Sequence, residues 1–180
     1  MRTSLTLSMA IAVLATITGC NPGVAPNTAA VAVRTDAQPS EQDKTWLRGI
    51  HQANLTEVES GRLAMDKGTT KRIKAVGEML VKDHAELDVK VTETASQLGV
   101  ELPSSPSADQ EALVARLEDA SGEDFDQDFL SGMIKAHKEV LAATKTEVSG
   151  GSSPAVKSLA ETAEASLKKH LAALKKAQRS

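Results

Sequence analysis

Four histidines are the residues of this 180-residue chain whose type and spacing could support shared chemistry. They are His51, His84, His137 and His170, and each falls in a different stretch in which apolar residues recur with helical spacing. Neutral imidazole is a good ligand for zinc, copper and iron. Whether the four rings can bind one ion depends on how the elements that carry them are arranged.

These elements are predicted to be helices. Abundant Ala, Leu, Lys and Glu, with only 2% aromatic residues, favour an all-helical core. We expect four long helices at about 43–67, 69–98, 123–148 and 154–178, and a short one near 108–120. Gly68 followed by Thr69 indicates a left-handed stop and a cap, and Ser153 followed by Pro154 indicates another helix start. The predicted fold is all-α, an antiparallel up-down-up-down four-helix bundle with the short helix in the central crossover.

The histidines are predicted to lie at similar depths in this bundle. Counted from the turns predicted at 68 and 151, they lie 17, 16, 14 and 19 residues along their helices. In an up-down-up-down bundle both turns are at the same end, so these depths spread over about 7.5 Å. Glu57 is in phase with the apolar residues of its helix, where a buried carboxylate needs a partner. The candidate transition-metal ligands are therefore Glu57, His84, His137 and His170, with His51 as an additional candidate.

A second interpretation of the same residues needs no metal. Buried histidines commonly hydrogen bond to one another, to a carboxylate or to the backbone, and the sequence leaves both interpretations open. It does argue against one kind of metal centre. Di-iron carboxylate bundles carry a Glu three residues before the His on two helices, whereas the positions three before the last three histidines hold Val81, Ile134 and Leu167. We therefore expect no ferroxidase-type di-iron centre.

The N-terminal residues are typical of an exported lipoprotein. Residues 1–19 have one positive charge, at Arg2, and an apolar run that is short for a membrane span. The run ends in ITGC, which resembles the lipobox of bacterial lipoprotein signals, and Cys20 is the only cysteine. The alternative is an ordinary secretory signal followed by a chance cysteine. We predict a signal peptide over 1–19 and lipidation of Cys20, which would anchor the protein to a membrane.

The mature chain is predicted to have two parts. Residues 20–43 contain the lipidated cysteine and a stretch rich in Ala, Pro and small polar residues that is typical of a flexible tether. Residues 44–178 are the predicted folded domain. By resemblance to other lipoproteins, Asn21 after the cysteine favours the outer membrane, facing the periplasm, if the host is Gram-negative.

Charge and motif content argue against several functions. The formal net charge of −3 gives no basic surface for nucleic acid. The chain has no glycine-rich phosphate loop, no nucleophile elbow and no nucleophile to accompany a histidine base. We therefore expect no nucleic-acid partner, and an enzyme has less support than a binding protein. The sequence does not indicate a protein partner.

Four stretches carry a resemblance to a known family. They are TEVESGRLA (56–64), EMLVKDHAE (78–86), FDQDFLSGMIKAH (125–137) and SLKKHLAALKKAQ (166–178). Together they resemble an exported, ferritin-like bacterial family catalogued as domain of unknown function 4142 and often labelled an outer membrane protein. The resemblance implies a ferritin-like bundle in the cell envelope, and its recurring Glu and His residues correspond here to Glu57, His84, His137 and His170. His51 is outside this pattern, and the family supplies no activity.

Two functions remain as expectations. The first is a lipid-anchored envelope protein that binds a transition metal or a small ligand through the His/Glu residues inside the bundle. The second is a structural or protein-interaction lipoprotein whose histidines only pack in the core.

Overall fold

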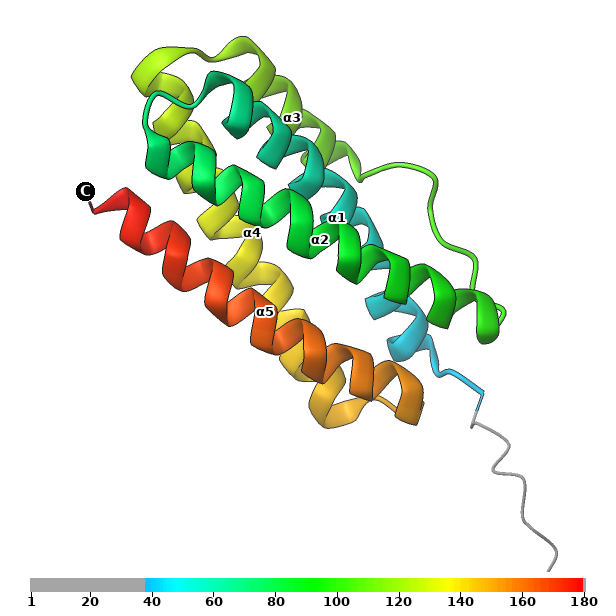
Figure 1. Cartoon of the computed structure of the whole chain (residues 1–180). Coiled ribbons are helices and arrows are strands. Elements are labelled where there is room, and N and C mark those ends of the chain that lie inside the picture. The colour runs from blue at the N-terminus through cyan, green and yellow to red at the C-terminus, as the bar shows by residue number, and fades with distance from the viewer. Residues whose placement is uncertain (1–37, 180) are drawn as a thin grey trace, which may run out of the picture. The chain divides into compact units, whose positions relative to one another are not determined.

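Helices are the regular secondary structure in the described part of the chain. A computed structural model describes residues 38–179, so the predicted signal peptide, Cys20 and most of the predicted tether lie outside the described residues. Five helices follow one another (Figure 1), namely α1 (Glu41–Lys67), α2 (Lys71–Gln97), α3 (Ala108–Asp119), α4 (Gly122–Gly150) and α5 (Pro154–Gln178). All five predicted helices are confirmed, with ends within two residues of the expected positions. No strand occurs over 38–179, and no helix in this range is both long and apolar enough to cross a membrane.

Helix α1 starts inside the stretch predicted as tether, because a capping box fixes its first turn. The Ser40 hydroxyl accepts a hydrogen bond from the Asp43 backbone N–H at 3.2 Å, and the Asp43 carboxylate accepts one from the Ser40 N–H at 2.6 Å. The same carboxylate accepts hydrogen bonds from the backbone N–H groups of Ser152 and Ser153. Asp43 therefore also ties the start of α1 to the turn between α4 and α5.

The turn between α1 and α2 differs from the expected one. Gly68 has φ −54° and ψ 132°, so it is not left-handed, and Thr70 rather than Thr69 caps α2. A Cβ at Gly68 would lie 2.5 Å from the carbonyl oxygen of Ala64 and 2.7 Å from a methyl group of Ile73. Glycine is needed here because the two helices approach closely, not because the backbone requires positive φ.

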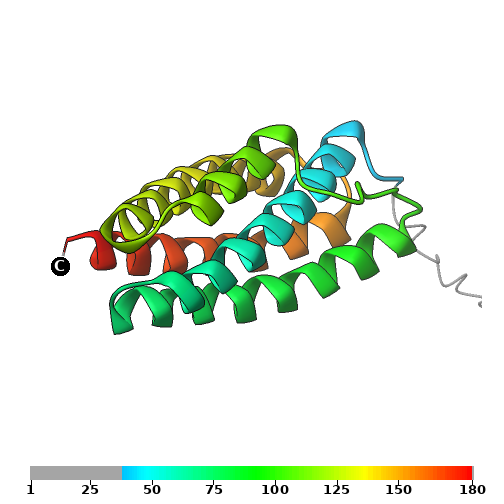
Figure 2. The ribbon, with the colours of Figure 1, turned by 90° about the horizontal axis from the view of Figure 1, so that it is seen from above.

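Each long helix packs against two others. Helix α1 contacts α2 and α4, and α5 contacts the same two helices from the other side. The short α3 lies along the outside of α1 and α4. Figure 2 shows this arrangement from above, with the long helices running side by side.

The expected up-down-up-down order is wrong. The α4–α5 turn is bonded to Asp43 at the start of α1, whereas Thr69 in the α1–α2 turn donates its backbone N–H to Asp126 at the start of α4, 3.1 Å away. The two turns therefore lie at opposite ends, and α2 and α4 run in the same direction (Figure 1). The cause is the connection over residues 98–121, in which a loop and the 12-residue α3 together carry the chain back along the bundle.

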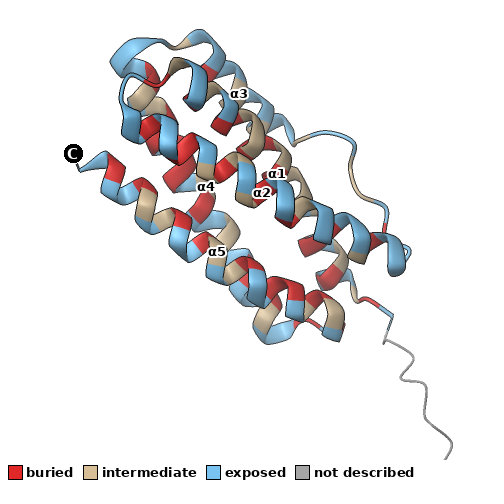
Figure 3. Cartoon of the chain, viewed as in Figure 1, coloured by how far each residue is buried: buried red, intermediate tan, exposed pale blue. Residues whose placement is uncertain are grey.

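Two hydrophobic clusters form the core, and a polar layer separates them. One cluster gathers residues near the start of α1, including Trp46, Leu47 and Leu167. The other gathers residues near its end, including Phe125 and Leu174. Buried positions follow the inward face of every long helix (Figure 3). In each of the four long helices, the residue predicted as a metal ligand lies between the positions that belong to the two clusters.

Candidate metal-binding site

The fold brings the four predicted ligands of the family pattern to one level of the core. Glu57 and His170 both lie 16 residues after the first residue of their helices, and His84 and His137 both lie 13 residues before the last residue of theirs. Because α1 and α5 run opposite to α2 and α4, these positions differ by about 4.5 Å along the bundle. The prediction that both turns lie at the same end is wrong, so the turns do not explain the shared depth. The four residues meet because each lies near the middle of its helix, which is at the same level whichever way the helix runs.

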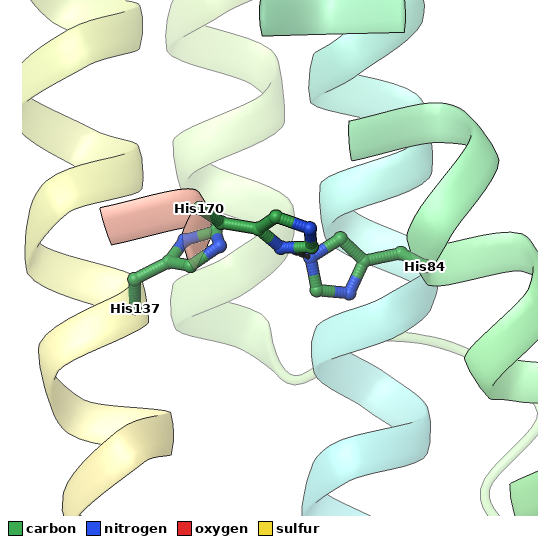
Figure 4. A group of neighbouring side chains, drawn as sticks. All are labelled: His84, His137 and His170. Carbon is green, nitrogen blue, oxygen red and sulfur yellow. Dashed lines mark hydrogen bonds between the residues drawn. The ribbon is translucent and has the colours of Figure 1, made fainter. Parts of the chain in front are cut away.

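Three imidazole rings point toward one another at this level (Figure 4). Their centroids are 4.9–5.6 Å apart, and one ligand atom from each of His84, His137 and His170 lies within 4.8 Å of the others. Glu57 completes the group, with Oε2 2.5 Å from His84 Nε2 and Oε1 3.3 Å from His137 Nδ1. All four side chains are buried. We call these four residues the His/Glu cluster.

Hydrogen-bond acceptors outside the cluster fix where His84 carries its proton. His84 Nδ1 lies 3.0 Å from Asn54 Oδ1, and the Asn54 amide donates its own N–H to Asp88, which fixes the orientation of the amide. His84 therefore donates from Nδ1. In the neutral ring, Nε2 then has a lone pair, and this is the nitrogen that faces Glu57.

The same reasoning applies to the other two rings. His137 Nδ1 lies 3.0 Å from the carbonyl oxygen of Met133 and donates to it, which leaves Nε2 as the unprotonated nitrogen, buried and without a hydrogen-bond partner over 38–179. His170 Nε2 lies 2.9 Å from Asp83 Oδ2 and donates to it. His170 Nδ1 is then the unprotonated nitrogen, 3.1 Å from His84 Nε2.

Electrostatics favour the forms of these residues that bind metals. Burial alone would raise the pKa of Glu57, but the nearby His137 and His84 rings lower it to about 2. Burial lowers the pKa of His137, and it lowers the pKa of His170 to about 4, although Glu57 and Asp83 respectively act in the opposite direction. The lowered pKa of Glu57 favours its ionised form and the lowered pKa values of the two rings favour their neutral form, which are the forms that bind metals.

The unprotonated nitrogens of His84 and His170 and the Glu57 carboxylate lie close enough together to need a cation between them. Lone pairs on His84 and His170 face each other, and the His84 lone pair also faces a carboxylate, so a neutral ring would be repelled on two sides. A proton on His84 or a metal ion relieves this repulsion. Two ligands of a tetrahedral zinc ion are about 3.3 Å apart, given metal–ligand distances of about 2.0–2.1 Å, which is close to the observed separation of the His84 and His170 nitrogens.

His51 does not join the cluster. It lies six residues before Glu57 on α1, about 9 Å along the helix, and its Nδ1 is 2.8 Å from Asp88 Oδ1 near the surface. It is connected to the cluster only indirectly, because Asn54 also bonds to Asp88.

Two residues that orient the rings were not predicted from the sequence. Asn54 is three residues before Glu57, so the helical spacing places both on one face and could have indicated it. Asp83 adjoins His84 in the sequence but reaches His170 on another helix. No pattern within α2 could indicate that contact, because it depends on which helix packs beside α2.

Comparisons with known proteins agree with this architecture. A crystal structure of a DUF305 fragment from Deinococcus radiodurans superposes with a TM-score of 0.70 at 15% sequence identity, covering 79% of this chain and 99% of that one. At this identity the likeness concerns the fold alone. No curated protein matches the chain significantly. A profile described as Domain of unknown function (DUF4142) matches residues 28–177. The chain therefore belongs to this family.

Proposed function

We propose that the protein binds one transition-metal ion in the His/Glu cluster. The observation that carries this proposal is the orientation of the rings. Separate acceptors on Asn54, Met133 and Asp83 each accept a hydrogen bond from a ring N–H, which leaves the other nitrogen unprotonated in each neutral ring. Such outer partners are typical of histidines that bind metals, because they fix the tautomer and the ring orientation.

The ligand set favours particular ions. Three imidazoles and one carboxylate suit zinc, copper or iron, and the four groups match the coordination number of zinc. An ionised carboxylate buried among apolar side chains is costly unless the charge has a partner. A bound divalent cation would supply this partner, which gives a physical reason for these side chains to occupy the middle of an otherwise apolar core.

A thermal melt with and without metal tests the proposal. Adding Zn²⁺ or Cu²⁺ to the metal-free full chain at about 100 times the dissociation constant stabilises the folded state by about 2.7 kcal/mol. For a domain of this size we expect the melting temperature to rise by about 5–10 °C. Glu57→Gln should lose most of the rise. Glu59→Gln, on the outer side of the same helix, should keep it. No rise in the wild-type chain with either ion would contradict the proposal.

We also propose that the domain is a ferritin-like, antiparallel four-helix bundle. Two tight hairpins joined by one long crossover are the connectivity of ferritin-like bundles, and the direction of α2 and α4 supports it. The protein is proposed to be an envelope lipoprotein anchored through Cys20, in the outer membrane and facing the periplasm of a Gram-negative host. The ITGC sequence supports lipid anchoring at Cys20, and Asn21 after it favours the outer membrane.

Membrane fractionation tests the anchor. The full chain should sediment with membranes, because several acyl chains on one residue hold a protein stably. Cys20→Ser should instead appear in the soluble exported fraction or as an unprocessed precursor. Equal membrane association of both proteins as cleaved, mature chains would contradict lipid anchoring at this residue.

A further inference from the structure

A pocket on the side of the bundle reaches the His/Glu cluster. It has a volume of about 410 Å³ and lies between α1, α3 and α4. Ala53, Thr56 and Glu57 line it from α1, while Ala136 and Glu139 are among the lining residues from α4. Six waters around a divalent ion occupy roughly 180 Å³ at about 30 Å³ each. The pocket is therefore large enough to admit an ion that still carries water.

Helix α3 forms the outer wall of this pocket, and it is the least firmly anchored helix. Leu117 is its only buried residue within the described range. Leu113 lies directly over Gly132 of α4, where a Cβ would come within 2.7 Å of a Leu113 methyl group. Segments with few buried apolar contacts open at low free-energy cost. The wall over Glu57 is therefore the part of the bundle that opens most readily.

The charges around the pocket suit a cation. Three acidic residues line it, namely Glu57, Asp109 and Glu139, against the two basic residues Arg116 and Lys135. Each basic residue lies near a carboxylate, with Arg116 Nε 3.5 Å from Asp128 and Lys135 Nζ 3.9 Å from Glu139. The lining therefore carries a net negative charge, and Glu57 is the member of the His/Glu cluster that lines the pocket.

We propose that this pocket is the path by which the metal ion enters and leaves the cluster, with Glu57 as the first ligand that the ion meets and α3 as the wall that controls passage. This inference rests on the proposed metal site and adds that its ion is exchangeable. The bundle would then hold a labile divalent cation that can be loaded and withdrawn without unfolding. A permanently enclosed structural ion would be released only when the protein unfolds.

Two alanines of α3 provide a matched test. Ala112 lines the pocket and is exposed, whereas Ala115 is exposed on the same helix and does not line it. Zn²⁺ uptake by the metal-free full chain would be followed by competition with a chromophoric chelator, and Zn²⁺ loss by excess chelator. Ala112→Trp should slow uptake and loss by a similar factor of ten or more, with the dissociation constant and stoichiometry unchanged. Ala115→Trp should exchange at the wild-type rate.

A second variant is expected to speed Zn²⁺ exchange, where Ala112→Trp should slow it. Leu113→Ala removes the side chain that covers Gly132, so exchange should become faster than in the wild-type chain. If Zn²⁺ exchange in both Ala112→Trp and Leu113→Ala proceeds at the wild-type rate, the pocket is not the entry path. A finding that exchange occurs only at the rate of global unfolding would also overturn the path. A wild-type chain that takes up no Zn²⁺ at equilibrium would instead contradict the metal site itself.

Discussion

At the scale of single residues, the outer partners of the rings decide what the cluster can do. Asp83 is the clearest case, because its carboxylate accepts a hydrogen bond from His170 Nε2–H and so leaves the unprotonated Nδ1 directed at His84. Without that acceptor, His170 would be free to adopt the other tautomer or to turn. Which nitrogen of His170 is unprotonated therefore depends on a residue outside the His/Glu cluster.

Removing Asp83 should weaken metal binding without removing a ligand. We expect Asp83→Ala to lower Zn²⁺ affinity by about 10–100-fold, the usual effect of losing an outer partner. Asp83→Asn retains an acceptor oxygen and should lose less. Glu86→Ala, an exposed acid on the same helix, serves as the control in a chelator competition assay. Unchanged affinity in Asp83→Ala would contradict the assigned tautomer.

A second buried carboxyl group makes stability depend on pH. Burial and the neighbouring Asp43 carboxylate raise the pKa of Glu147 to about 7, with Gln42 and Lys157 acting in the opposite direction. A raised pKa means that the folded state binds more protons than the unfolded state between about pH 4.5 and 7. The contribution of Glu147 to stability therefore falls as pH rises through this window.

Comparison with Glu147→Gln isolates this effect from the histidines. The glutamine side chain at this position is uncharged at every pH. The free energy of unfolding of the variant should therefore resemble that of the wild type at pH 5 and exceed it at pH 8. We expect a relative gain of about 1 kcal/mol, on the scale of about 1.4 kcal/mol for each unit by which a pKa shifts. Urea unfolding of both metal-free proteins at the two pH values measures it. A stability difference that does not change with pH would rule out the raised pKa.

At the scale of helices, the site depends on how closely α1 and α2 approach. Gly61 and Gly77 face each other, and a Cβ on Gly77 would lie 2.5 Å from the Gly61 carbonyl oxygen and 2.9 Å from the Ala64 methyl group. The two backbones touch about 6 Å along α1 from Glu57 and about 10.5 Å along α2 from His84. Any side chain at Gly77 would push the helices apart.

Two glycine substitutions should therefore have opposite signs. Gly77→Ala should destabilise the fold by about 1–3 kcal/mol, the usual cost of overpacking a core. A Cβ on Gly49, in α1, would meet no atom within 4 Å, and Gly49→Ala should stabilise the fold by about 0.5–1 kcal/mol through helix propensity. Denaturant midpoints of both variants measure the effects. A Gly77→Ala protein as stable as the wild type would contradict the close approach.

The helices themselves could be predicted from the sequence. Apolar spacing located all five, and Ser153 caps α5 as expected. The Ser40–Asp43 capping box was present in the sequence but was assigned to the tether. The need for glycine at Gly68 arises from a close contact with Ile73 of the next helix, so local spacing along α1 cannot reveal it.

At the scale of the whole molecule, the direction of α4 could not be predicted from hydrophobic periodicity. A pattern of inward and outward positions is the same for a helix that runs up or down. The direction follows from the connection over residues 98–121, in which a loop and α3 return the chain along the bundle and bring Asp126 to the α1–α2 turn. The cluster was nevertheless found, because its four members lie near the middle of their helices and are set apart from their neighbours by residue type.

Measuring the metal content of the purified protein shows directly whether the His/Glu cluster binds a transition-metal ion. The full chain would be purified without a histidine tag from metal-replete exported expression, beside His84→Ala/His137→Ala/His170→Ala and His51→Ala, and analysed by mass spectrometry, with circular dichroism to confirm folding. If the His/Glu cluster binds metal, we expect about one transition-metal ion per chain in the wild type and in His51→Ala, and none in the triple variant. A folded wild-type chain with no metal, or a triple variant that retains the wild-type amount, would contradict it.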